Sequence, residues 1–332
     1  MMRTRTGALC RIAVCIAMAA VVAWTGLAET VTNVRGMQRK SSNFVDIYYD
    51  LESTDGGVFS VKVEVEGKTG AVSASSLSGD VGGYISPGRN RHVVWNAGAD
   101  WSNNKGDVRV VVTTTKEDDV KRGKVQLWAG GPYWATTNIG AEKPWDYGLY
   151  FWWGDTVGYK RENNAWVATN GSSYNFSFGS PNTPTYDKSP ATLQSEGWIV
   201  SKDGTYVLAP EHDAAQVQWG DGWRMPTCQE LDDLCENCDW TLRMVSGVNG
   251  YVVSGRGDYS SNSIFLPCCG CGYGASFRGA GSGGDYWSSV PYSDSYDGSW
   301  GLEFSSSHSY HGSWGLDRSY GFSVRPVQGF TE

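Results

Sequence analysis

The sequence predicts a mostly β protein with a few helices, of the α+β class, that begins with a β-sandwich. The clearest sign is FSVKVEVEG at residues 59–67, where apolar and charged residues alternate strictly, as in a strand with one buried and one wet face. Composition is the second sign, because 43 Gly, 16 Trp and 18 Tyr among 332 residues favour a turn-rich protein with many aromatic contacts. The third is that strong helix-start signals stand out near residue 227.

Residues 1–28 are predicted to be a secretory signal peptide. Arg3, Arg5 and Arg11 precede the apolar run IAVCIAMAAVVAWTGLA, which ends in small residues suited to cleavage before Glu29. The run is short for a membrane span, and the alternative is a retained membrane anchor. We therefore expect a secreted or cell-surface protein with no membrane insertion after cleavage.

The charge of the mature chain argues against two classes of binding partner. Residues 29–332 contain 24 Lys and Arg against 35 Asp and Glu, which gives a net charge of −11. A chain this acidic does not attract phosphate backbones, so nucleic acid and anionic membranes are not expected as partners.

Two domains joined by a linker are expected after the leader. Residues 29–115 contain several β-rich runs separated by Gly-, Asn- and Pro-containing turns, and their length suits an immunoglobulin-like or fibronectin-like β-sandwich. Residues 116–124 are rich in charges of both signs and are expected to be an exposed linker. A second, β-rich domain is expected over residues 125–332. Within it, residues 160–190 are rich in Asn, Ser, Thr and Pro and are expected to form a long irregular insertion.

One helix is predicted in the second domain. Thr227 is followed three residues later by Glu230, and in this spacing each side chain accepts a hydrogen bond from the other residue's backbone N–H. Leu231, Leu234 and Cys235 then share a core-facing stripe, and the helix is expected to end near residues 236–237.

Six cysteines follow the leader, all within 44 residues, and they are predicted to form structural disulfides in an oxidising compartment. Six cysteines allow fifteen pairings, so the connectivity stays open. Cys228 and Cys235 lie about 10 Å apart on the predicted helix, beyond disulfide reach, so a bridge from the helix region to the CCGC sequence is more plausible. The candidates are Cys228, Cys235, Cys238, Cys268, Cys269 and Cys271.

Other chemistry has weaker sequence support. Four of the five thiols of CENC and CCGC are an alternative tetrahedral Zn²⁺ site, and the CENC pair is an alternative redox motif. Scattered acids leave Ca²⁺ open, although none has EF-hand spacing. The sequence contains no HExxH, GxSxG, phosphate-loop or dinucleotide-binding motif, and His212, between two acids, is expected to belong to a helical turn. We therefore expect a protein that is not an enzyme and needs no cofactor.

Several segments together resemble a known family. GDGWRMPT, CDWTL, GVNGYVVSG, SIFLP, GDYWSSVPY and RSYGFSVRPV, in this order over residues 125–328, resemble the Fibrobacter succinogenes major paralogous domain. The resemblance implies a C-type-lectin-like fold of the formylglycine-generating-enzyme kind in a secreted or surface protein. The oxidase of that fold uses a cysteine pair close to its C-terminal core motif, whereas no cysteine follows Cys271 here. Variable proteins of diversity-generating retroelements, which are similar in fold, place a ligand-facing patch just before such a closing segment.

The C-terminal segment contains a repeat and an unusual composition. YDGSWGLEF at 296–304 is followed by YHGSWGLDR at 310–318, and residues 292–320 include 9 Ser, 4 Tyr, 4 Gly, 3 Asp and 2 His, a composition typical of antibody binding surfaces. We expect the Trp and Leu of each GSWGL to point inward and the residues between them to point outward. The predicted ligand-binding residues are Tyr292, Asp294, Tyr296, Asp297, His308, Tyr310, His311, Asp317 and Tyr320.

The function expected from these observations is non-catalytic binding of a macromolecular ligand, a cell-surface glycan or protein. The alternatives are a formylglycine-generating-type oxidase, which would need a reactive thiolate of low pKa, and a structural component of the cell envelope. An ordinary β-meander that binds no ligand is the corresponding alternative for the C-terminal segment.

Overall fold

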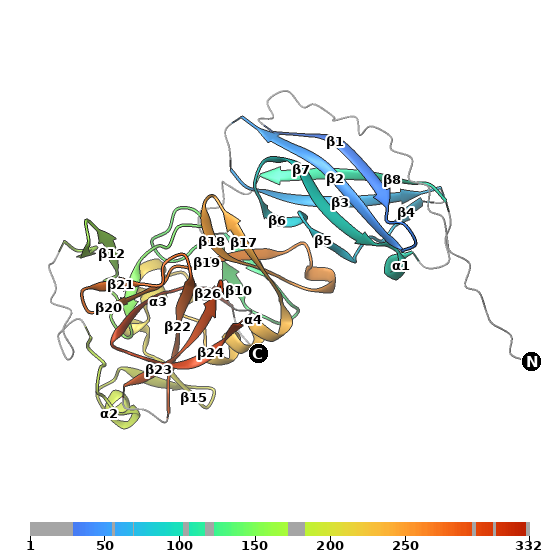
Figure 1. Cartoon of the computed structure of the whole chain (residues 1–332). Helices are drawn as coiled ribbons and strands as arrows, with labels where there is room; N and C mark the ends of the chain where they lie inside the picture. Colours follow the sequence, from blue (N-terminus) through green and yellow to red (C-terminus); the bar gives the residue numbers. More distant parts are fainter. Residues whose placement is uncertain are drawn as a thin grey trace, which may run out of the picture. The chain divides into compact units, whose positions relative to one another are not determined.

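The computed structural model describes residues 29–54, 57–68, 70–101, 106–116, 123–171, 183–293, 297–307 and 310–329. The chain divides into two compact units, residues 1–119 and 120–332, which are considered separately (Figure 1). The predicted signal peptide and most of the predicted linker lie outside the described residues. None of the helices in the described part of the chain is long and apolar enough to cross a membrane.

The described residues of the first unit form two four-stranded sheets and a short helix, α1 (Ala97–Asp100). Along β3 the phenylalanine and the valines are buried while the intervening charged residues are exposed, as the strict alternation in the sequence predicts. Buried side chains of both sheets belong to one hydrophobic cluster. One sheet has the order β1 (Glu29–Gln38), β2 (Phe44–Ser53), β7 (Gly88–Asn96), β5 (Leu77–Gly79); in the other, β3 (Phe59–Gly67) pairs with β4 (Gly70–Val72), β6 (Gly82–Ile85) and β8 (Val108–Lys116).

The second unit is built around a nine-stranded sheet that is mostly antiparallel. Seven of its strands follow one another in the order β13 (Ala165–Ala168), β12 (Tyr159–Glu162), β11 (Tyr150–Trp152), β25 (Tyr320–Ser323), β22 (Gly283–Pro291), β23 (Gly298–Ser305), β24 (Tyr310–Asp317). The other two form a side branch, in which β20 (Cys271–Tyr273) pairs with both β25 and β21 (Ser276–Arg278). The protein is therefore mostly β with a few helices, as predicted.

Smaller sheets and helices complete this unit (Figure 1). The sheets are β16 (Trp223–Arg224), β26 (Val327–Gln328), β10 (Tyr133–Ala135), β9 (Lys124–Gln126); β17 (Asp239–Val245), β18 (Val248–Ser254), β19 (Ser263–Pro267); and β14 (Ile199–Lys202) with β15 (Thr205–Leu208). The helices are α2 (Pro190–Ser195), α3 (Ala214–Trp219), α4 (Cys228–Asn237) and the 3₁₀ turns η1 (Pro210–His212) and η2 (Gly257–Tyr259).

The expectation of an irregular insertion over residues 160–190 is wrong at its start. β12 and β13 form a hairpin whose two turn residues, Asn163 and Asn164, both have positive φ, 49° and 62°. Asparagine tolerates this left-handed backbone better than most residues, which makes an Asn-Asn pair between short strands a hairpin signal. Residues 172–182 lie outside the described part of the chain.

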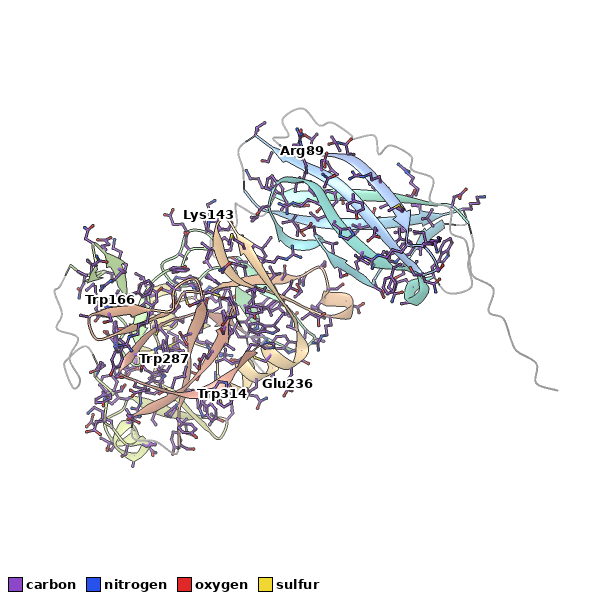
Figure 2. The ribbon with its side chains drawn as sticks, in the orientation of Figure 1. Arg89, Lys143, Trp166, Glu236, Trp287 and Trp314 are labelled. Atoms are coloured by element: carbon purple, nitrogen blue, oxygen red, sulfur yellow. The ribbon has the colours of Figure 1, made fainter. Side chains whose placement is uncertain are left out.

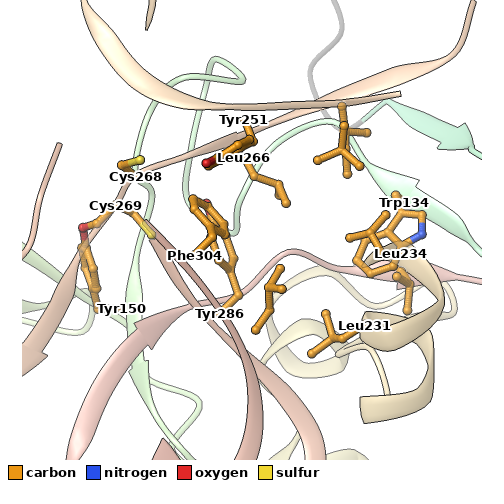
Figure 3. Packing of buried hydrophobic residues seen from close by; sticks show 14 of the residues in the cluster. Trp134, Tyr150, Leu231, Leu234, Tyr251, Leu266, Cys268, Cys269, Tyr286 and Phe304 are labelled. Atoms are coloured by element: carbon orange, nitrogen blue, oxygen red, sulfur yellow. The ribbon is translucent and has the colours of Figure 1, made fainter. Parts of the chain in front are cut away.

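The predicted helix is confirmed as α4. Thr227 and Glu230 form the reciprocal capping box, and Glu230, fully buried, also receives two hydrogen bonds from Arg224 at 2.6 and 2.7 Å. Leu231 and Leu234 are buried and face Phe304 and Tyr286 of the large sheet (Figure 3). The helix thus covers one face of the sheet at its C-terminal strands.

Both faces of the large sheet are packed, as two neighbouring residues of β22 show. Their side chains point to opposite sides of the sheet. Tyr286 belongs to the cluster that includes the α4 leucines, whereas Trp287 belongs to a second cluster with Phe322 of β25 and residues of α2 and α3. This sheet, fixed on both sides, is the scaffold from which the connections between its strands project.

Candidate functional site

The repeated GSWGL segments form the antiparallel hairpin β23–β24, but their tryptophans do not both point inward. In the observed register Trp300 pairs with Gly315 and Gly301 pairs with Trp314. Cross-strand partners share a face and neighbours alternate, so this register places Trp300 and Trp314 on opposite faces. Trp300 is half-buried, whereas Trp314 is 49 % exposed on the outer strand β24 (Figure 2). The prediction that both rings are core residues is therefore wrong for Trp314.

The six cysteines between residues 228 and 271 are free thiols, so none of the predicted disulfides is present in the structure. Cys268 and Cys269, consecutive in the chain, are fully buried in the cluster beneath the large sheet (Figure 3). Burial raises the pKa of Cys235, Cys238, Cys268 and Cys271 to about 12, and that of Cys269 to about 11. Thiols in such surroundings pack as small apolar groups and are poor nucleophiles.

The connections between strands meet at one end of the sheet around Arg318, which is fully buried. Its Nε and two Nη atoms donate hydrogen bonds to the backbone oxygens of Gly298, Thr185 and Lys188 at 3.1, 2.5 and 3.0 Å. Its backbone N–H donates to the backbone carbonyl oxygen of Asp297 at 2.7 Å. Arg318 thus joins the turn at 183–188, which lies 130 or more residues earlier in the chain, to the start of β23 and the end of β24.

Near this arginine, turns and strand ends carry tyrosines and carboxylates, which we call the loop-end surface. Tyr273 and Tyr320 are cross-strand partners whose ring centroids lie 4.7 Å apart, and the Arg278 guanidinium lies 4.4 Å from the Tyr273 ring. All six members are at least partly exposed. The loop-end surface consists of Tyr186, Asp187, Tyr273, Asp297, Asp317 and Tyr320.

Electrostatic effects show that these groups are close together. Burial raises the pKa of the Tyr186 phenol, and the nearby Asp317 and Asp297 carboxylates raise it further. The pKa of Arg318 is lowered to about 10 by burial, and the same two carboxylates oppose this effect. Asp317 also accepts a hydrogen bond from the Ser319 N–H at 2.7 Å, which holds its carboxylate at the turn.

The predicted binding residues divide into three groups. Asp297, Asp317 and Tyr320 meet at the loop-end surface, and Tyr292 lies beside it, where its ring packs edge-on against Trp300 at 4.9 Å. Asp294, Tyr296, His308 and the side chain of Tyr310 lie outside the described residues.

His311 contradicts the prediction that it points outward for contact. Its ring stacks on Trp240 at 4.3 Å, and this partial burial lowers the pKa of the imidazole. It also lies six residues before Asp317 along β24, about 20 Å away at the usual strand rise. His311 therefore contributes to packing at the far end of the hairpin.

Sequence reasoning missed Tyr186, Tyr273 and Asp187. Tyr273 had a usable signal, because it lies in the short aromatic and glycine-rich stretch CGYGASFRG, which forms the hairpin β20–β21. Tyr186 and Asp187 had none, since they reach the site only through the hydrogen bonds of Arg318 to a turn 130 or more residues away.

A cavity of about 640 Å³ lies elsewhere in this unit, between the β14–β15 hairpin and the first turn of α4. Its lining includes Lys202, Asp213, Arg224 and Cys228 but none of the predicted binding residues. Asp213 caps α3 and accepts hydrogen bonds from the N–H groups of Ala215, Gln216 and Met225, and Arg224 is paired with Glu230. These polar groups are therefore engaged in holding the fold.

Within the described residues, no three His, Cys, Asp or Glu side chains gather in a way suited to a metal ion. The zinc and calcium alternatives therefore receive no support from the geometry.

Comparison with known proteins gives one match. Residues 255–327, from the loop after β18 to β26, match the model of a family described as a domain of unknown function, DUF8237. This segment contains the β22–β24 strands, Tyr273, Arg318 and Tyr320. No curated protein and no solved structure matches the chain.

Proposed function

We propose that this chain is a secreted or cell-surface binding protein, without catalytic activity, whose C-terminal unit contacts a macromolecular glycan or protein ligand through the loop-end surface. The observation that carries this proposal is the convergence of separate turns on Arg318, which holds tyrosines and carboxylates together on a rigid sheet. Tyrosine offers a large contact area with few rotatable bonds, and binding residues are commonly placed on loops fixed by such a scaffold.

We also propose a fold for each of the two domains. We infer an immunoglobulin-like or fibronectin-like sandwich for residues 29–115 and a C-type-lectin-like domain for residues 125–332. The inferred lectin-like domain agrees with the order of the family-like segments in the sequence and with a mostly antiparallel sheet that presents its loops at one end. Removal of residues 1–28 during secretion is part of the proposal.

The thiols favour binding over the oxidase alternative. A catalytic cysteine needs a low pKa, whereas burial raises the pKa of Cys228, Cys235, Cys238, Cys268, Cys269 and Cys271. The structural-component alternative predicts self-association, which sedimentation of the mature protein measures directly.

The test is a glycan- and protein-array screen with the mature chain, followed by two variants. Tyr273→Ala and Tyr320→Ala should each weaken binding of the ligands found by about 1–2 kcal/mol or more. Tyr206→Ala, which removes a tyrosine 40 % exposed on β15, is the matched control and should bind as the parent does. Equal binding by all three variants, with unchanged melting temperatures, would contradict the proposal.

A further inference from the structure

We propose that the loop-end surface recognises a positively charged polypeptide segment, whose Lys or Arg side chains lie on its tyrosine rings and beside its carboxylates. This inference depends on the proposed binding function of the same surface and names the ligand class. It is supported by the charge of the unit, by the positions of three carboxylates and by a guanidinium already bound to one of the rings.

Charge is unevenly divided between the two parts of the mature chain. Residues 29–124 contain 13 basic and 13 acidic residues, whereas residues 125–332 contain 11 basic and 22 acidic residues. The whole net charge of −11 therefore belongs to the C-terminal part. Such an excess attracts cationic partners over a distance of about one Debye length, roughly 8 Å at physiological salt.

Three of these acids lie at the turns that Arg318 brings together. Asp297 directly precedes β23, Asp317 ends β24, and Asp187 is exposed in the 183–188 turn. Backbone contacts of Arg318 reach Asp297 directly and the residues on either side of the Tyr186–Asp187 pair. The three carboxylates thus border the same tyrosines.

Local cations offset only part of this charge. Arg318 lies fully buried beneath the surface, and Lys188 is paired with Glu196 at 2.6 Å. Arg278 is exposed and stacks on Tyr273. Asp187, Asp297 and Asp317 are partly or fully exposed, so an approaching partner meets their carboxylates beside Tyr186 and Tyr320, while the charges of Asp297 and Asp317 also act on Arg318.

The Arg278 contact shows which chemistry suits these rings. Its guanidinium carbon lies 4.4 Å from the Tyr273 centroid, within the range of a cation–π interaction. Tyr320 packs against the same tyrosine, which places a second ring beside the one that Arg278 contacts. A neutral glycan would use the rings and donate hydroxyl groups to the carboxylates, whereas a basic peptide would in addition be attracted by the net negative charge.

The experiment measures binding of a fluorescently labelled oligo-arginine peptide to the mature chain, with oligo-glutamate and Gly-Ser peptides as comparisons. We expect binding of oligo-arginine alone, weakening by about tenfold or more between low and high salt because exposed charges are screened. The triple variant Asp187→Asn, Asp297→Asn, Asp317→Asn should lose about tenfold in affinity. Asparagine keeps a side-chain oxygen that accepts the Ser319 N–H, and an unchanged melting temperature shows that the turns persist.

A second triple variant, Glu142→Gln, Glu211→Gln, Asp258→Asn, removes the same charge from exposed positions elsewhere in the unit. It should reduce affinity by less than about threefold, since only long-range attraction changes. Equal losses in both triple variants would overturn the inference, because the charge of the whole unit would then explain binding.

The outcomes separate this inference from the proposed function. If array ligands are neutral glycans that require Tyr273 and Tyr320 but not the three aspartates, the binding surface stands and the cationic ligand is wrong. If no ligand depends on either the tyrosines or the aspartates, both are wrong.

Discussion

Trp300 and Trp314 occupy the same place in two copies of GSWGL, yet they project from opposite faces of one hairpin. The cause is the register, in which each tryptophan pairs with a glycine of the other copy, Trp300 with Gly315 and Trp314 with Gly301. Only one of the two rings can then face the cluster of Leu302 and Phe304. The repeat is therefore not a duplicated core motif, and its copies have different roles.

Tryptophan substitutions should reflect this difference. Trp287→Ala, which removes a fully buried ring, should lower the free energy of unfolding by about 3–5 kcal/mol. Trp314→Ala should lower it by less than about 1 kcal/mol, because its ring is half exposed. Urea denaturation of the second unit, followed by fluorescence, measures both. A larger loss for Trp314→Ala than for Trp287→Ala would show that the assigned faces are exchanged.

Arg318 should be more important for stability than its position in a turn suggests. Arg318→Lys keeps the charge but loses the forked donors that reach the carbonyl oxygens of Gly298, Thr185 and Lys188. Leaving such buried acceptors unpaired should cost about 2–4 kcal/mol in the free energy of unfolding. Arg278→Lys, at an exposed arginine of the same surface, is the control and should change stability by less than about 0.5 kcal/mol. Similar values for the two variants would contradict the organising role of Arg318.

The features that could be predicted from the sequence are those fixed by interactions between residues close together in the chain. The alternation of β3 and the capping box of Thr227 and Glu230 involve neighbours within four residues, and both are present in the structure. The faces of Trp300 and Trp314 depend on the pairing register of the two strands, and a one-residue change in register would place both rings on the same face. No single-strand pattern contains that information.

Residues of the candidate site were likewise predictable only where they lie close together in the chain. Asp297, Asp317 and Tyr320 were accessible to prediction because they surround one hairpin with an unusual composition. Tyr186 joins them only because the buried Arg318 binds the 183–188 turn, a contact that spans more than 130 residues. His311 was misplaced because its stacking partner, Trp240, lies 71 residues earlier in β17.

The state of the cysteines is directly measurable. The structure has six free thiols between residues 228 and 271, whereas the oxidising compartment favoured disulfides. Thiol titration of the unfolded, unreduced mature protein should give about six reactive groups per chain. In the native protein the reaction at neutral pH should be much slower, because burial keeps these thiols protonated. Fewer than six groups before reduction, and six after it, would show that disulfides form after all.

Asp285 should make the stability of the second unit depend on pH. It pairs directly across the β22–β23 ladder with Glu303, so two carboxylates face each other. Burial raises the pKa of Asp285 to about 7, and the Glu303 carboxylate contributes to the shift. In the unfolded chain the pKa of the same carboxyl group is about 3.9.

The pKa of Asp285 is higher in the folded state than in the unfolded state. Between about pH 4 and pH 7 this carboxyl group is therefore protonated in the folded state and ionised in the unfolded state. The free energy of unfolding should therefore fall as the pH rises through this window and level off above about pH 7. Asp285→Asn removes this titrating group, so the fall in its unfolding free energy with pH, measured by urea denaturation at several pH values, should be smaller than in the parent. Asp155 and Asp213, whose pKa values burial also raises, keep the remaining slope. Glu303→Gln keeps Asp285 but removes the opposing charge, and its slope should end at a lower pH. A parent protein whose stability is flat or rises across this window, with Asp285→Asn no different from it, would show that Asp285 is ionised in the fold and that the pair is solvated.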